Sequence, residues 1–371
     1  MKVMLFGSDA FSTFAIKGLL KARSKLDLSF QVFTTKPTSH RPHPFADFAE
    51  QNKVPLTFLD RLNDGNSVNF APILELKNSQ NQLNDQTDLT EKTQNEIEQV
   101  MMACSFGYMV PSEVIDLFSK SFVVHPSLLP RYRGSSPISA ALLKGDSETG
   151  TSIVGMSRGK FDAGPIFAQK SCPIPPHFLY SDLWEKLGCL SEELVYEFFE
   201  NYEAALKNPT PQGKGTSAPR LKQGDADVSF VHEDAQKIHR KFRAYTGSTL
   251  KKICLFFGDK QEKFFVDQLE IFSDDEFLPE IGLRLNAILP PGFAFRGPGD
   301  LKKYLVVKAK SGFVIIKSGH FDKKSPAAMN LIMKRFCSEE LSKLIVNAIK
   351  NPSTFDEEKA SQLIQVAPKF N

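Results

Sequence analysis

The chain has 371 residues, of which 41% are hydrophobic and 24% are charged, with a net charge of +3, so two ordinary globular domains are expected. No run approaches the roughly 20 apolar residues that span a bilayer, and we predict no membrane segment. The cysteines are five in number, scattered and without a Cys-x-x-Cys pair, which argues for a reducing compartment and against a structural zinc site.

The charge is unevenly distributed along the chain. Residues 207–371 hold 27 Lys and Arg against 19 Asp and Glu, a net charge of +8, whereas residues 1–206 hold 19 against 24, a net charge of −5. A basic half joined to a mildly acidic half indicates a polyanion-binding module attached to another domain. A solvated lysine-rich surface accounts for the same numbers, so charge alone leaves both interpretations open.

Short apolar runs alternate with helical patterns in the first half of the chain. We expect strands and helices in turn at residues 3–7, 10–22, 30–34, 45–51, 54–58, 101–105, 122–125 and 151–156. This alternation predicts the α/β class, with a Rossmann-like, doubly wound, mostly parallel sheet. Ligands of such sheets usually bind beyond the carboxyl ends of the strands, which is where the residues after 101–105 and 122–125 are expected.

Two polar stretches divide the chain. Residues 77–99 are rich in Asn and Gln and nearly free of large apolar groups, so we interpret them as a surface insertion within a first domain, residues 1–206. Residues 207–220 are rich in Pro, Gly, Ser and Thr and are predicted to be a linker.

The remaining residues, 221–371, are predicted to form a small β-rich domain, plausibly of barrel type. A helical pattern is followed by short strand-like runs that are separated by Gly, Pro and charged turns. The helical pattern and the runs cover residues 233–245, 254–257, 264–271, 304–307 and 313–316.

The candidate chemistry centres on His125 and Asp162. His125 closes a predicted strand and is followed by a loop whose prolines fix a non-helical path, and Asp162 lies in a glycine-flanked loop after the strand 151–156. A histidine with a carboxylate partner can act as a general base, or stay protonated and stabilise an oxyanion. A structural histidine and an ordinary turn aspartate fit the same residues, because the pattern does not show that the two meet.

Motifs of nucleotide-binding sites are absent from the sequence. Neither a G-x-G-x-x-G fingerprint nor a phosphate-binding G-x-x-x-x-G-K-[ST] loop follows the first strand. The turn Gly7–Asp9 can still bring backbone N–H groups towards a ligand at a helix N-terminus, although tight packing between strand and helix explains it equally well.

Several segments resemble one enzyme superfamily. The stretch His125–Ile138, HPSLLPRYRGSSPI, closely resembles the signature of folate-dependent formyltransferases. Lys160–Ile166 (KFDAGPI) is similar to the aspartate loop of that superfamily, and Met4–Ser12 (MLFGSDAFS) to its first strand, turn and helix. Ser105–Pro111 fits the segment ahead of the catalytic strand, so the resemblance covers most of residues 1–206 and implies the formyltransferase fold.

The second half of the chain resembles one family within this superfamily. Pro211-Gln212, Ala218–Leu221 and Arg243–Tyr245 resemble the linker and C-terminal domain of methionyl-tRNA formyltransferases, most of all their mitochondrial eukaryotic members. In that family the appended domain is an OB-like barrel that helps to hold tRNA, and the +8 charge of residues 207–371 suits contacts with phosphates. The resemblance implies a monomer in the mitochondrion. The sequence shows no presequence, and the cytoplasm is the alternative location.

The resemblance also implies a reaction and its residues. A formyl group would pass from 10-formyltetrahydrofolate to the amino group of methionyl initiator tRNA, without a metal ion. His125 would stabilise the oxyanion, and Asp162 would orient its imidazole and help to move protons. The loop expected to line the folate site comprises Ser127, Leu128, Leu129 and Pro130. The candidates for contact with the acceptor end of the tRNA are Arg41, Arg131 and Arg133.

One residue departs from the family pattern. The family has an asparagine two residues before the histidine, whose amide donates a hydrogen bond to the developing oxyanion, and this chain has Val123. Residues 123 and 125 of a strand lie on the same face, so the Val123 side chain occupies the position of the family's asparagine. Valine cannot donate a hydrogen bond to the oxyanion. Loss of one such donor typically costs ~2.7–4 kcal/mol.

Three consequences of Val123 are open: another donor substitutes, the enzyme is slow, or the chain binds folate or tRNA without chemistry. We expect an active enzyme, because His125, Asp162 and the intervening loop match the pattern. Transfer to a small amine, and hydrolysis of formyl-folate, are the alternative reactions.

Overall fold

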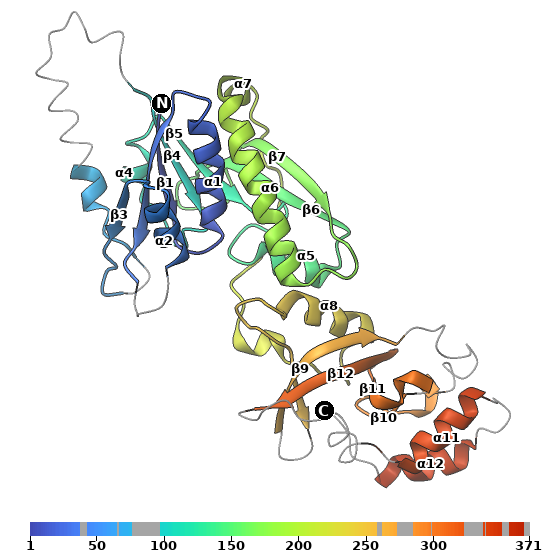
Figure 1. Cartoon of the computed structure of the whole chain (residues 1–371). Helices are drawn as coiled ribbons and strands as arrows, with labels where there is room; N and C mark the ends of the chain where they lie inside the picture. The colour runs from blue at the N-terminus through green and yellow to red at the C-terminus, as the bar shows by residue number, and fades with distance from the viewer. Residues whose placement is uncertain are drawn as a thin grey trace, which may run out of the picture. The chain divides into compact units, whose positions relative to one another are not determined.

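The computed structural model describes residues 1–37, 43–64, 67–75, 97–257, 262–272, 285–297, 299–322, 337, 339–350 and 356–366. The chain forms two compact units (Figure 1). Unit 1 comprises Met1–Ala141, Ser147–Pro176 and Asp182–Arg220, and unit 2 comprises Leu142–Asp146, His177–Ser181 and Leu221–Asn371.

Unit 1 is built on a seven-stranded sheet of order β3-β2-β1-β4-β5-β6-β7. Its strands are β1 (Lys2–Gly7), β2 (Ser29–Thr35), β3 (Leu56–Leu59), β4 (Gln99–Cys104), β5 (Lys120–His125), β6 (Glu148–Gly155) and β7 (Ile166–Pro173). Strands β1 to β5 pair in parallel, and β6 runs antiparallel to both β5 and β7. The predicted α/β class with a mostly parallel sheet is confirmed.

Helices pack against this sheet. The helices of this part of the chain are α1 (Ser12–Arg23), α2 (Pro44–Gln51), α4 (Ser112–Ile115), α5 (Pro137–Lys144), α6 (Tyr180–Glu200) and α7 (Tyr202–Lys207). Helices α1 and α6 contact each other closely, because Gly188 leaves room for the ring of Phe14, whose Cε2 would lie 2.1 Å from a Cβ at that position. The ring of Trp184 packs against Phe14 at 5.5 Å between centroids.

Aromatic side chains fill the rest of the core of unit 1. Phe6 of β1 stacks on Phe33 of β2 with 4.9 Å between ring centroids, and belongs to a buried cluster that reaches Phe118. Phe122 of β5 packs edge-on against Phe167 of β7 and Phe198 of α6. The middle strands therefore have hydrophobic residues on both faces, as expected for parallel strands covered on both sides.

The order of strands in unit 1 determines where a ligand can bind. From β1 the chain proceeds to β2 and β3 on one side, and then returns to β4 and β5 on the other. In open α/β sheets, ligands usually bind beyond the carboxyl ends of the strands where the strand order reverses, which here is between β1 and β4. His125 is the last residue of β5, the strand next to β4, so it lies at this edge.

Unit 2 contains a five-stranded antiparallel sheet of order β10-β11-β12-β9-β8. Its elements are η1 (Gln223–Ala226), α8 (Ala235–Tyr245), β8 (Cys254–Phe257), β9 (Glu262–Ile271), β10 (Ala294–Arg296), η3 (Gly299–Lys303), β11 (Leu305–Lys308), β12 (Phe313–Phe321), α11 (Glu339–Lys350) and α12 (Glu357–Val366). Phe295, Val306 and Phe313 of the sheet form one core with Ile345 of α11 and Ile364 of α12. This unit is consistent with the predicted β-rich domain. Among the described strands, no pairing joins β8 to β10 to close a barrel.

The predicted insertion and the predicted linker can be compared with the structure. Of the predicted insertion 77–99, residues 77–96 lie outside the described residues, and Gln99 already begins β4, where it pairs with Lys2 of β1. The predicted linker 207–220 begins at the end of α7 and then lies along unit 1, with Thr210 paired to Ile166 and Ser217 paired to Arg133. In the described part of the chain, no helix is both long and apolar enough to cross a membrane.

The aromatic cluster around Phe122 gives a stability prediction. Phe122→Ala removes a ring that is 1% exposed, so the free energy of unfolding of unit 1 should fall by about 3–5 kcal/mol. The chain has a single tryptophan, Trp184, whose fluorescence during denaturation with urea reports on unit 1. Phe161→Ala, at a ring that is 55% exposed, is the matched control and should change stability by less than about 0.5 kcal/mol. Equal losses in both variants would contradict this account of the core.

Candidate active site

The structure brings His125 and Asp162 together, although they are 37 positions apart in the sequence. His125 ends β5, and Asp162 lies in the turn between β6 and β7 with a backbone φ of +52°. Asp162 Oδ2 lies 3.5 Å from His125 Nδ1, and both side chains are buried, at 9% and 6% exposure. The same carboxylate oxygen accepts a hydrogen bond from the Gly134 N–H at 2.9 Å.

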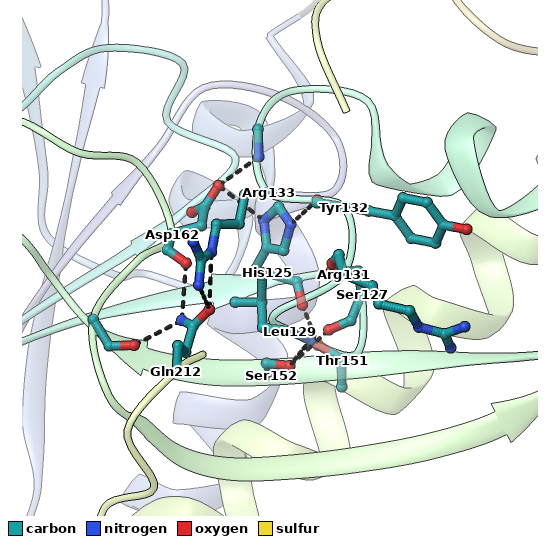
Figure 2. A network of polar contacts seen from close by, with 12 residues as sticks. His125, Ser127, Leu129, Arg131, Tyr132, Arg133, Thr151, Ser152, Asp162 and Gln212 are labelled. Carbon is teal, nitrogen blue, oxygen red and sulfur yellow. Dashed lines mark hydrogen bonds and ion pairs between the residues drawn. The ribbon is translucent and has the colours of Figure 1, made fainter. Parts of the chain in front are cut away.

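The second ring nitrogen of His125 is also held by the chain. His125 Nε2 lies 2.8 Å from the carbonyl oxygen of Tyr132, which can only accept, so Nε2 carries a proton (Figure 2). A neutral ring therefore presents an unprotonated Nδ1 on the side of Asp162. A second proton taken up at Nδ1 gives a cation directly beside the carboxylate, an arrangement that suits proton transfer.

The loop after His125 turns sharply to place these groups. Tyr132 has a φ of +63°, and Gly134 has a φ of +110°, a region in which glycine is favoured because it lacks a Cβ. The turn directs the carbonyl of Tyr132 towards the imidazole and the N–H of Gly134 towards Asp162. Backbone atoms thus complete the site, which a motif of side chains alone does not show.

The predicted folate-lining residues form a closely bonded loop. The Ser127 hydroxyl donates to the carbonyl of Arg131 at 2.7 Å, and the Ser127 residue is fully buried. Ser152 of β6 donates to the carbonyl of Ser127 at 2.6 Å and accepts from the N–H of Leu129 at 3.1 Å. Leu129 is buried, whereas Leu128 and Pro130 are partly exposed and contribute the accessible part of the loop.

The three predicted arginines have different surroundings. Arg133 lies against Gln212, whose Oε1 accepts from its Nε at 3.0 Å and from its Nη2 at 2.7 Å. Arg131 is exposed and extends away from His125, with Nη2 3.5 Å from the carbonyl of Glu148 (Figure 2). Arg41 lies outside the described residues.

Sequence reasoning missed Gln212 as part of this site. The predicted linker holds it, and its side chain bonds to both loops that carry the candidate residues. Its Nε2 donates to the carbonyls of Asp162 and Gly164 at 2.9 and 2.7 Å, while its Oε1 accepts from Arg133. In the sequence, the pair Pro211-Gln212 pointed to a protein family, but it gave no indication that the side chain of Gln212 belongs to the site.

The structure gives the neighbours of Val123. It pairs with Ala103 of β4 on one side and with Val154 of β6 on the other. Neither side chain has a hydrogen-bond donor, so the adjacent strands offer no substitute for the missing amide at that level of the sheet.

The residues after the turn Gly7–Asp9 bond to the turn itself, and the N–H of Ser8 donates to the hydroxyl of Ser12 at 3.2 Å. The N–H groups of Phe11 and Ser12 donate to Asp9 Oδ1, and Ser105 donates to Asp9 Oδ2 at 2.6 Å. Burial raises the pKa of the Asp9 carboxyl, even though the residue as a whole is exposed, and the hydrogen bonds oppose that shift. The chain's own carboxylate thus occupies the start of α1.

No metal centre is evident among the described residues. They contain no group of three or more His, Cys, Asp or Glu side chains placed to hold a metal ion.

The chain is similar to known proteins over most of its length. Residues 1–196 match the family model described as Formyl transferase. The methionyl-tRNA formyltransferase of Thermotoga maritima is 26% identical over 343 residues, which cover 87% of this chain and 99% of that protein. The mitochondrial methionyl-tRNA formyltransferase of Homo sapiens is 24% identical, over 85% of this chain and 73% of that protein.

A solved structure shows the same fold. HypX from Aquifex aeolicus, in complex with tetrahydrofolic acid, superposes with a TM-score of 0.50 at 14% identity, over 90% of this chain and 46% of HypX. The chain therefore spans less than half the length of HypX, and this likeness concerns the fold alone.

Ser152 provides a test of how the loop after His125 is held. Its hydroxyl satisfies the carbonyl of Ser127 and the N–H of Leu129, so Ser152→Ala leaves buried groups unpaired. The free energy of unfolding of unit 1 should fall by about 1–3 kcal/mol, again measured by Trp184 fluorescence. Ser171→Ala, an exposed serine on the neighbouring strand β7, is the control and should change it by less than about 0.5 kcal/mol. If Ser152→Ala is as stable as this control, the loop is held by other contacts.

Proposed function

Because the chain belongs to the formyl transferase family, we propose that it transfers a formyl group from 10-formyltetrahydrofolate to the amino group of methionyl initiator tRNA in translation initiation. The observation that carries this proposal is the extent of the match. A relative named methionyl-tRNA formyltransferase aligns over 87% of this chain and 99% of its own length, so the likeness must extend well into unit 2.

The geometry supports a general-base role for His125. The neutral amine of the methionyl ester attacks the formyl carbon, a carbon–nitrogen bond forms, and the carbonyl electrons move to oxygen. In the neutral form of the ring, the single proton lies on Nε2, which donates to the Tyr132 carbonyl, so His125 Nδ1 can take the proton that the amine nitrogen loses. Asp162 lies beside the resulting imidazolium, which can donate to the oxyanion.

The second half of the reaction returns the enzyme to its starting state. The bond between the formyl carbon and N10 of the folate breaks as the oxyanion collapses, and the leaving nitrogen receives the proton from His125. The imidazole and the carboxylate of Asp162 are then as before, so the cycle needs no external oxidant or reductant.

The donor is proposed to bind along the loop from Ser127 to Pro130. The buried hydroxyl of Ser127 serves the loop itself, so Leu128, Pro130 and the backbone are the parts that face the donor. A solved relative by fold, HypX, binds tetrahydrofolic acid, which supports a folate as donor.

The tRNA is proposed to contact both units. Residues 207–371 carry a net charge of +8, which suits contacts with phosphates. The described antiparallel sheet of unit 2 has five strands, the number in an OB fold, and this supports an OB-like domain that holds RNA. Arg131 and Arg41 are the proposed contacts to the acceptor end. Arg133 already bonds to Gln212, and we now assign it to the structure of the site. We further propose that the protein is a monomer and that it lies in the mitochondrion, the location named for the human relative.

Variants at His125 and Val123 test the proposed reaction. In single-turnover formylation of methionyl initiator tRNA, His125→Ala should lower the rate by at least about 10²-fold. Val123→Asn should raise the rate by up to about 10²-fold, because it restores an oxyanion donor where Ala103 and Val154 offer none. An unchanged rate in His125→Ala would remove the ring from the mechanism. An unchanged rate in Val123→Asn would mean that another donor already serves the oxyanion.

The net charge of +8 on residues 207–371 predicts that tRNA binding depends steeply on salt. Raising NaCl from 50 to 200 mM should weaken binding of initiator tRNA by at least about 10²-fold, because each neutralised phosphate releases counterions. Filter binding at several salt concentrations measures the slope. Binding of the folate donor in the same buffers is the control and should change much less. A flat response for the tRNA would contradict a phosphate-contacting role.

A further inference from the structure

The amide of Gln212 uses both of its ends on the two loops of the site. Gln212 Oε1 accepts two hydrogen bonds from the guanidinium of Arg133, at 3.0 and 2.7 Å. Gln212 Nε2 donates one hydrogen bond to the carbonyl of Asp162 at 2.9 Å and another to that of Gly164 at 2.7 Å. The side chain thus forms a bridge between the loop after His125 and the loop of Asp162, as Figure 2 shows.

The residues that bond to Gln212 are Asp162 itself or neighbours of the residues that contact His125 and Asp162. Arg133 stands between Tyr132, whose carbonyl faces His125, and Gly134, whose N–H donates to Asp162. On the other side, Gln212 holds the backbone carbonyl of Asp162 itself. A shift of the Gln212 amide therefore changes the distance between imidazole and carboxylate.

The backbone around Gln212 makes the bridge rigid. The N–H of Arg133 donates to the carbonyl of Thr216 at 2.8 Å, and the N–H of Ala218 donates to the carbonyl of Arg133 at 2.7 Å. Thr216 also accepts from the N–H of Tyr132 through its hydroxyl at 2.9 Å. Thr210 exchanges two backbone hydrogen bonds with Ile166, each of 2.8 Å. The segment from 210 to 218 is consequently fixed at both ends.

We propose that Gln212 is a positioning residue for the formyl transfer: it ties the loop of Asp162 to the loop after His125 and so sets the distance between carboxylate and imidazole. This inference rests on the proposed function for its kinetic test. Glutamine suits this role because its amide oxygen can accept from the guanidinium of Arg133 while its NH₂ group donates to the carbonyls of Asp162 and Gly164. Glutamate keeps the acceptor but turns a second oxygen towards the carbonyls of Asp162 and Gly164.

The kinetic test compares Gln212→Ala and Gln212→Glu with the wild type in formylation of methionyl initiator tRNA. Both variants should lower kcat by about 10- to 100-fold, because displacements of about 1 Å cost rates of that order, while KM for donor and acceptor stays within about threefold. Ser217→Ala is the matched control, since this exposed side chain lies in the same segment. Its kcat should equal that of the wild type.

A double-mutant cycle with Asp162→Asn separates positioning from a general loss of structure. If Gln212 acts through Asp162, adding Gln212→Ala to Asp162→Asn lowers the rate by less than about threefold further. If the glutamine only supports the fold, the two losses multiply, and the proposal is wrong. Retention of the wild-type melting temperature by Trp184 fluorescence, within about 3 °C, excludes unfolding as the cause.

Hydrogen exchange gives a readout that needs no activity. The N–H of Gly134 donates to Asp162 Oδ2, so Gln212→Ala should speed its exchange at least about tenfold, and Ser217→Ala should leave it unchanged. If the Gly134 N–H exchanges fast in Gln212→Ala and the wild-type protein does not formylate methionyl initiator tRNA, the proposed reaction is wrong but the role of Gln212 in holding the two loops stands. If the wild type is active and Gln212→Ala changes neither the exchange of the Gly134 N–H nor kcat, the positioning role of Gln212 is wrong and the proposed reaction stands.

Discussion

The carboxylate of Asp162 is the constraint on which the site depends. One oxygen accepts the N–H of Gly134 and faces the imidazole of His125, so a single buried charge joins the turn after β6 to the loop after β5. A buried carboxylate needs such partners, because an unpaired charge away from water is costly. Positive φ angles at Tyr132 and Gly134 turn the loop so that the Gly134 N–H reaches Asp162. The hydrogen bond that His125 Nε2 donates to the carbonyl of Tyr132 holds the imidazole in the same place.

Much of the fold follows from patterns that are local in the sequence. Every strand expected in residues 1–125 exists, because each is a short apolar run bounded by turn residues, and His125 does end its strand. The expected strand 151–156 is β6, but its antiparallel direction depends on pairing with β5 and β7, which no local pattern encodes. In unit 2, β10 has only three residues and gains its burial from β11 and α11, so its own sequence carries little signal.

The site was predictable only in part, for a similar reason. The residue types at His125 and Asp162 indicated a pair, whereas their meeting depends on two loops that approach each other only in the folded sheet. Arg133 was predicted to contact nucleic acid as an arginine in a basic loop, and its bond to Gln212 is a further contact that the local sequence does not encode. Gln212 itself lay in a segment that composition marked as a linker, and composition does not encode long-range hydrogen bonds.

A competition experiment tests whether this chain formylates methionine on initiator tRNA. The wild-type protein is incubated with 10-formyltetrahydrofolate that carries a labelled formyl group, and with methionyl initiator tRNA, methionyl elongator tRNA and a free sugar amine in competition. The account predicts that the label appears in N-formylmethionine released from the initiator tRNA. Label in the sugar amine, or as free formate when no acceptor is present, would contradict it.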